Sequence, residues 1–256
     1  MSMLEDDDPS AQTGASAASS VKTSAAGVRG VEWRAMAGEF IGCVMLMVVV
    51  VGSGLAAQSL SPGDVGLELL ENALAIGAGL FVIINIIAPV SGAHLNPVVS
   101  LADAWIGSCS WLRAVLYLPC QFAGCVVGTI VANRMFGDPW ISWSTHHRAS
   151  GAHFFSEIVA TAGLILLIFA LQRNGRRSLG AAAVGLYIFA ACFATSSATF
   201  ANPAVTVARA FTNSFTGIAP GSLLVYIAGQ LIGATCGVAV TVLLYPHKES
   251  DSPHAT

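Results

Sequence analysis

Charged residues are scarce in this sequence. Asp, Glu, Lys and Arg make up only 10% of its 256 residues, whereas a soluble domain of ordinary composition has about 25%. Hydrophobic residues make up 55%, and the mean hydropathy is +0.71. The sequence therefore predicts a membrane protein with several spanning segments.

Several functional signatures are also missing. The chain has no basic cluster and a formal net charge of −3, so we expect no nucleic-acid partner. Its six cysteines include no CxxC pair, which favours small buried apolar residues over disulfides or a metal site. There is no nucleotide-binding loop and no catalytic constellation. We therefore expect no enzyme activity, no cofactor and no bound metal.

The two ends of the chain differ from its centre. Residues 1–30 are acidic at first and then rich in Ser and Ala, with no apolar run of the kind that a signal peptide has. We expect this segment to be a disordered tail, and residues 247–256 to be a second polar tail. The central domain between them then covers residues 31–246.

Six apolar stretches are long enough to span a bilayer, which needs about 20 residues each. They lie near residues 33–56, 69–89, 112–133, 153–172, 179–198 and 221–245. Two further apolar stretches, about 95–106 and 201–212, are too short to span and each carries Asn-Pro near its start. We interpret them as re-entrant half-helices. The predicted fold class is an all-α membrane protein with six transmembrane helices and two half-helices.

The second half of the chain repeats the first. Because each half has three spans, an odd number, the halves must have opposite polarity, which defines an inverted repeat over about 33–135 and 153–245. The matching elements are Glu39 with Glu157, Asn96 to Asp103 with Asn202 to Arg209, and Gln121 with Gln230.

The two Asn-Pro pairs predict helix starts at the centre of the membrane. Proline in a first helical turn costs little because its missing N–H would be unpaired there, and asparagine caps such a start. Inverted repeats bring the two N-termini together, each with about +0.5 charge. The carboxamides of Asn96 and Asn202 can then donate to a passing oxygen, while cations meet a barrier. This pattern favours a passive channel for neutral solutes.

These motifs resemble those of the aquaporin, or major intrinsic protein, family over residues 33–245. The resemblance rests on the stretch from Ser91 to Val98, on Asn202-Pro203-Ala204, and on the two glutamates. It implies a right-handed helix bundle, homotetramers with one pore per subunit, and passive transport. The implied pore motifs are Asn96, Pro97 and Val98 in the first half and Asn202, Pro203 and Ala204 in the second. Val98 stands where the family has alanine, so we expect two extra methyl groups near the central constriction.

The resemblance also implies a four-residue selectivity filter, placed by its offsets from the two asparagines. Its members are Ile76, Ala190, Thr199 and Val205. Family water channels usually have arginine at the Val205 position, so this filter should be wider and uncharged. Cys192, two residues after Ala190, is expected to lie off the filter face. The filter resembles that of a bacterial branch of the family, which is linked to arsenic-resistance genes.

The uncharged filter favours water together with small neutral solutes such as glycerol, urea or arsenous acid. Two alternatives remain open. One is a strict water channel. The other is an ion-coupled secondary transporter, which can also have inverted repeats and broken helices.

Ionisable residues near the motifs have two open interpretations. Arg209 shares a helix face with Asn202, and Asp103 shares one with Asn96, so they could line the outer and inner vestibules or pair locally. His94, two residues before Asn96, is expected at the inner end of the pore. For Glu39 and Glu157 we favour a structural role, as acceptors for the backbone of the re-entrant loops, over proton coupling.

Lysine and arginine placement predicts the orientation. Most lie on the side that holds both termini, so the positive-inside rule places both termini in the cytoplasm, in a cell (inner or plasma) membrane. The expected partners are therefore the lipid bilayer, water and small neutral solutes.

Overall fold

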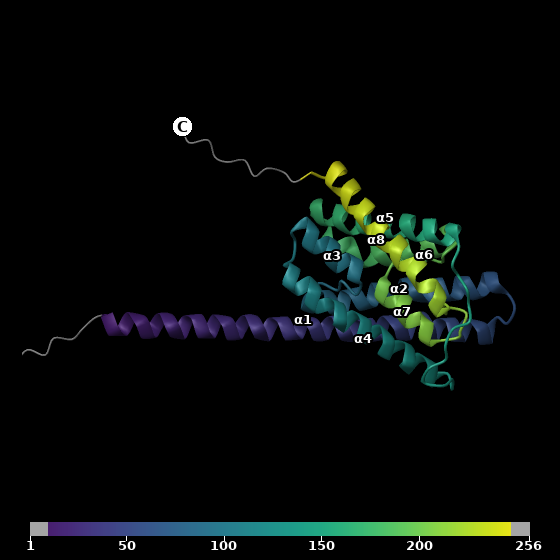
Figure 1. Cartoon of the computed structure of the whole chain (residues 1–256), viewed down its shortest axis with the longest axis horizontal. Coiled ribbons are helices and arrows are strands. Elements are labelled where there is room, and N and C mark those ends of the chain that lie inside the picture. The colour runs from purple at the N-terminus through teal and green to yellow at the C-terminus, as the bar shows by residue number, and fades with distance from the viewer. Residues whose placement is uncertain (1–9, 247–256) are drawn as a thin grey trace, which may run out of the picture.

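The structure, a computed structural model, describes residues 10–246, with side chains described from Glu32 onward. It is all-helical within that range, and Figure 1 shows the helices gathered into one bundle. The α-helices are α1 (Ser10–Leu60), α2 (Val65–Ser91), α3 (Pro97–Ile106), α4 (Trp111–Met135), α5 (Gly151–Arg173), α6 (Gly180–Ala194), α7 (Pro203–Ala208) and α8 (Leu223–Leu244).

Six helical segments of the described chain are long and apolar enough to cross a membrane. They are Glu32–Leu60, Val65–Ser91, Trp111–Met135, Gly151–Arg173, Arg177–Ala194 and Pro220–Leu244. All six predicted spans are thereby confirmed. The segment predicted at 179–198 ends earlier, because the chain leaves α6 in an extended conformation at Thr195 to begin the second re-entrant loop.

The predicted tails lie largely beyond what the structure describes. Residues 1–9 and 247–256 are outside the described residues, and residues 10–31 are described only as backbone, where they form the start of α1. Figure 1 shows this part of α1 projecting away from the bundle. The disorder of residues 1–30 stays a prediction.

The bundle has two ends, and the chain order determines which segments lie at each. The tail end carries Glu32 and Pro246, and the loop end carries residues 136–150, which connect α4 to α5. The half-helices begin near the centre. From there α3 runs back toward the tail end, and α7 runs toward the loop end and continues as a 3-10 turn over Arg209–Phe211. This is the predicted inverted arrangement.

Close helix crossings hold the spans around this centre. A Cβ added at Gly128 of α4 would lie 2.8 Å from the Cβ of Met47 on α1, and one at Gly237 of α8 would lie 2.7 Å from the Cβ of Ile165 on α5. Small residues at such crossings let helix backbones approach each other in a membrane. The equivalent crossings α1–α4 and α5–α8 show that the sequence repeat is also a structural repeat.

Candidate functional site

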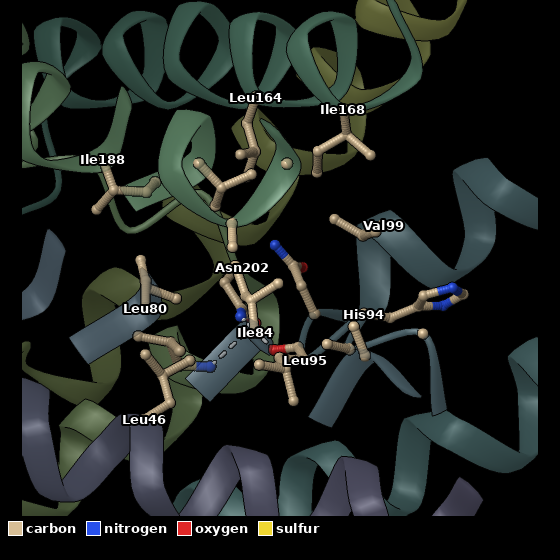
Figure 2. A pocket seen from close by; sticks show the side chains of 18 of the residues that line it. Leu46, Leu80, Ile84, His94, Leu95, Val99, Leu164, Ile168, Ile188 and Asn202 are labelled. Carbon is tan, nitrogen blue, oxygen red and sulfur yellow. Dashed lines mark hydrogen bonds between the residues drawn. The ribbon is translucent and has the colours of Figure 1, made fainter. Parts of the chain in front are cut away.

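The two Asn-Pro pairs meet at the centre of the bundle. Asn96 caps α3, accepting a hydrogen bond from the N–H of Val98, and Asn202 caps α7, accepting from the N–H groups of Ala204 and Val205. Each carboxamide nitrogen donates to the opposite loop: Asn96 Nδ2 to the carbonyl of Ala201, and Asn202 Nδ2 to the carbonyl of Leu95, both at 2.8 Å. Figure 2 shows the Asn202 contact.

A carboxamide nitrogen has two hydrogens, and the opposite loop takes one from each asparagine. Both asparagines also line the central cavity. The pair can therefore offer donors to an oxygen that passes between them, at the positive ends of two helices.

The loops before the half-helices have strained backbones. Ala93 and Leu95 in the first loop have φ of 52°, and Thr199 and Ala201 in the second have φ of 48° and 46°. Left-handed backbone costs a non-glycine residue about 1–2 kcal/mol. Something must therefore hold these loops in place.

Two buried glutamates hold the loops. Glu39 accepts hydrogen bonds from the backbone N–H groups of His94 (2.9 Å) and Leu95 (2.6 Å), and also from Ser91 and Gln121. In the second half, Glu157 accepts from the N–H groups of Phe200 (3.0 Å) and Ala201 (2.8 Å) and from Gln230 (2.6 Å). Each carboxylate thus satisfies backbone donors that a regular helix would have paired internally.

A cavity of about 630 Å³ runs along the centre of the bundle. At the tail end its walls include Arg113, Gln172 and Arg177, and at the loop end they include Arg148 and Phe215. Figure 2 looks into its middle, where Asn202 lies among apolar side chains such as Leu80, Leu164 and Ile188. The cavity therefore connects the two ends past the paired asparagines.

Three of the four positions assigned to the filter line this cavity: Ile76, Thr199 and Val205. The fourth assignment needs correction, because Ala190 is exposed on the outer side of α6 and is not a cavity residue. The cavity face of α6 instead carries Ile188 and Cys192. The expectation that Cys192 lies away from the pore was therefore wrong.

The Val98 expectation also needs correction. Its side chain is buried against α5 and α8, in a cluster with Ile165, Phe169 and Val238, and it does not line the cavity. The extra methyl groups therefore fill the contact between α3 and its neighbouring spans and leave the central constriction unchanged.

At the tail end, His94 and Asp103 both line the cavity. Nε2 of His94 lies 3.4 Å from Oδ2 of Asp103, and its Nδ1 lies 3.0 Å from Oγ of Ser100. Burial raises the pKa of Asp103, but its contact with His94, together with Cys109 and Arg177, lowers the pKa below its ordinary value. This end of the cavity therefore presents a carboxylate.

At the loop end, Arg209 both lines the cavity and is anchored locally, so the two interpretations are not exclusive. Its Nε donates to the carbonyl of Thr216, and its guanidinium lies 3.5 Å from the centre of the Phe200 ring. The cavity thus has a buried cationic group, Arg209, at its loop end, and the carboxylate of Asp103 beside Arg113 and Arg177 at its tail end.

Several cavity residues were missed at the sequence level. Arg148 lies in the loop between the halves, outside every motif of the sequence, yet it lines the loop end. Asn72, one helical turn before Ile76, donates to the carbonyl of Val50 and to Ser53 while facing the cavity. Its spacing from Ile76 was the one available signal, because residues four apart on a helix share a face.

Comparison with known proteins gives consistent matches. The family model described as Major intrinsic protein matches residues 28–201. Aquaglyceroporin AqpS of Rhizobium meliloti is 43% identical over 202 residues, which is 79% of this chain and 86% of that protein. The lens fiber major intrinsic protein of Bos taurus is 32% identical over 235 residues, covering 86% of this chain and 84% of that one.

A solved structure shows the same fold. The aquaglyceroporin from Plasmodium falciparum superposes with a TM-score of 0.63, covering 84% of this chain and 95% of its own, at 24% identity. At that identity the likeness supports the fold alone. The sequence relatives carry the argument for the family.

Proposed function

The chain belongs to the major intrinsic protein family of membrane channels, and from that premise we propose that it conducts water and small uncharged solutes of the glycerol and urea type, with arsenous acid among them. It is a channel of the aquaglyceroporin type for small neutral solutes, not an enzyme. The uncharged wall at Ile76, Thr199 and Val205 carries the proposal for these particular solutes.

The cavity wall must replace part of the water that a solute loses on entering the pore. A solute that enters a narrow pore gives up water, and the pore must return hydrogen bonds at the right places. Here the aliphatic groups leave width, Thr199 offers one hydroxyl, and the asparagine pair offers donors at the centre. A small polyol or neutral metalloid hydroxide alternates hydroxyl groups with less polar surface, and this wall suits such a solute. Cations are opposed by the two helix N-termini.

We assign the roles of the site residues within the same proposal. Asn96 and Asn202 form the central constriction. Ile76, Thr199 and Val205 form the filter, and Cys192 takes the place first given to Ala190. The vestibules contain His94 and Asp103 at one end and Arg209 at the other. Glu39 and Glu157 support the loops.

Proteoliposome swelling tests the solute range. We expect the purified chain to accelerate swelling in glycerol, urea and arsenous acid as well as in water, because no side chain of the filter is large or charged. The flux should not saturate with solute concentration and should not respond to membrane potential. Swelling in water alone would instead support a strict water channel, and saturation with dependence on an ion gradient would support a coupled carrier.

We also propose that both termini lie in the cytoplasm. Arg113, Arg173 and Arg177 lie toward the tail end, against Arg134 and Arg148 toward the loop end, so the positive-inside rule favours a cytoplasmic tail end. A cleavable tag placed after Thr256 should therefore be cut by added protease in inside-out vesicles and protected in right-side-out vesicles. The opposite pattern would reverse the orientation.

The quaternary structure belongs to the proposal as well. We propose a homotetramer with one pore in each subunit, which rests on membership of the family. The continuous cavity within a single chain supports one pore per subunit, because it lies within one bundle.

A further inference from the structure

Two arginines from distant parts of the chain meet at the loop end of the cavity. Arg148 comes from the loop between the two halves, and Arg209 follows α7. Both line the cavity, and both guanidinium groups lie against Phe200, at 5.8 Å and 3.5 Å from its ring centre respectively. We call the part of the cavity walled by Arg148, Phe200, Arg209 and Phe215 the loop-end vestibule.

Backbone carbonyls hold both arginines in place. Arg148 donates from Nε to the carbonyl of Gly217 and from Nη2 to the carbonyl of Phe215, both at 2.9 Å. Arg209 donates from Nε to the carbonyl of Thr216. Three consecutive carbonyls of one loop therefore fix two side chains, and all three acceptors are neutral.

Within the part of the chain whose side chains the structure describes, neither arginine has an anionic partner. Among residues 32–246, no carboxylate lies within ion-pair distance of Arg148 or Arg209. Arg209 is only 6% exposed, and its two terminal nitrogens have no hydrogen-bond acceptor within that part of the chain. A buried charge without a counter-charge is costly, and these nitrogens remain available to a group in the cavity.

The electrostatics at this end favour an anion. Arg209 caps the C-terminal end of α7, whose partial charge of about −0.5 offsets only part of the two positive charges. Guanidinium groups present their N–H donors in a planar fork that matches two oxygens of a carboxylate or of a phosphate-like ion. The aromatic face of Phe200 stabilises both cations where they are partly dehydrated.

An anion at this site should not pass through the channel. Beyond the vestibule it would lose water against the aliphatic groups of Ile76, Ile188 and Val205. The favourable position is therefore at the mouth, in the path of neutral solutes.

We propose that the loop-end vestibule is a binding site for a small oxyanion, held by Arg148 and Arg209, and that its occupancy blocks solute flux. The binding site follows from the geometry alone. The block rests on the channel function proposed above, so the experiment measures binding and flux separately.

Inorganic phosphate is the probe, with chloride at equal ionic strength as the reference. Binding is measured by the broadening of the phosphorus NMR line on addition of the full-length chain in detergent. The variants Arg209→Gln and Arg148→Gln should weaken phosphate binding about tenfold or more, because each removes a charge-assisted interaction. Arg209→Lys, which keeps the charge but loses the fork, should fall between them and the unaltered chain.

Arg134→Gln is the matched control. Arg134 is also near the loop end, bonds a carbonyl at Asp138 and lies 5.1 Å from the centre of the Trp140 ring, but it is exposed and outside the cavity. We expect its variant to bind phosphate as the unaltered chain does. Should Arg209→Gln fail to fold, Arg148→Gln makes the same comparison. Arg148 is only half-buried, so its replacement removes fewer buried contacts.

Flux is then measured as glycerol swelling of proteoliposomes in phosphate and in chloride. Phosphate should slow swelling of the unaltered chain and of Arg134→Gln, and the vestibule variants should need about tenfold more phosphate for the same effect. Equal phosphate binding by all variants, or none by the unaltered chain, would overturn the site. Binding without slower swelling would overturn the block. Phosphate binding that depends on the arginines in a chain without glycerol flux would overturn the channel proposal and leave the site standing.

Discussion

Glu39→Ala is expected to abolish a stable fold. Four donors would lose their acceptor: the N–H groups of His94 and Leu95, the hydroxyl of Ser91 and the amide of Gln121. Each buried donor left without an acceptor costs about 1–3 kcal/mol. Their sum is comparable to the about 5–15 kcal/mol that holds a typical protein folded. Detergent-extracted protein should show little monodisperse material and a strongly lowered Tm.

Glu32→Ala is the control, because it removes a carboxylate from the same helix seven residues earlier. Its ion pair with Arg113, at 2.7 Å, is only half-buried, and a pair of that kind contributes about 0–1 kcal/mol. We therefore expect near-normal yield and Tm for this variant. If Glu39→Ala melted at the same temperature as Glu32→Ala, the loop-supporting role would be wrong.

Val205→Arg should cut glycerol flux about tenfold or more, since a barrier increase of about 1.4 kcal/mol is enough for a tenfold loss. Val205 is 5% exposed and lines the cavity together with residues of α2 and α6. An arginine there narrows the cavity and places a cation four residues from Arg209, on the same helix face. Stopped-flow swelling should show a smaller loss for water than for glycerol.

Val205→Thr is the control for Val205→Arg, because it changes the same side chain without adding bulk or charge. Threonine has nearly the same shape as valine and adds one hydroxyl, so glycerol flux should stay close to that of the unaltered chain. Glycerol flux through Val205→Arg equal to that of the threonine variant would show that this position does not control solute size.

The fold class could be predicted from the sequence alone. Hydropathy alone located the six spans, because only a stretch of about 20 apolar residues crosses a bilayer as a helix. The repeated Asn-Pro located the two half-helices, because proline and asparagine act within one turn of where they stand. Both signals are local, and neither depends on how the helices pack.

The filter could be predicted only in part from local sequence offsets. Thr199 and Val205 each lie three residues from Asn202. Because they are so close to Asn202 in the chain, the local backbone places both in the cavity wall. Ala190 is separated from Asn202 by the turn that follows Ala194. The direction of its side chain therefore depends on the rotation of α6, which is set by the contact of α6 with α2. There, a Cβ on Gly77 would lie 2.8 Å from the carbonyl oxygen of Gly185. That crossing turns Ile188 and Cys192 inward and Ala190 outward.

The loop-end vestibule depends still more on tertiary structure. The sequence by itself determined the spans, the inverted repeat, the paired asparagines and the helix face that Arg209 shares with Asn202, because each follows from chain-local geometry and solvent preference. Only the folded bundle decided that Arg148 meets Arg209 over Phe200, and that no carboxylate among residues 32–246 lies within ion-pair distance of either arginine. Contacts of this kind depend on how helices and loops that are far apart in the chain pack together. No local stretch of the sequence therefore predicts them.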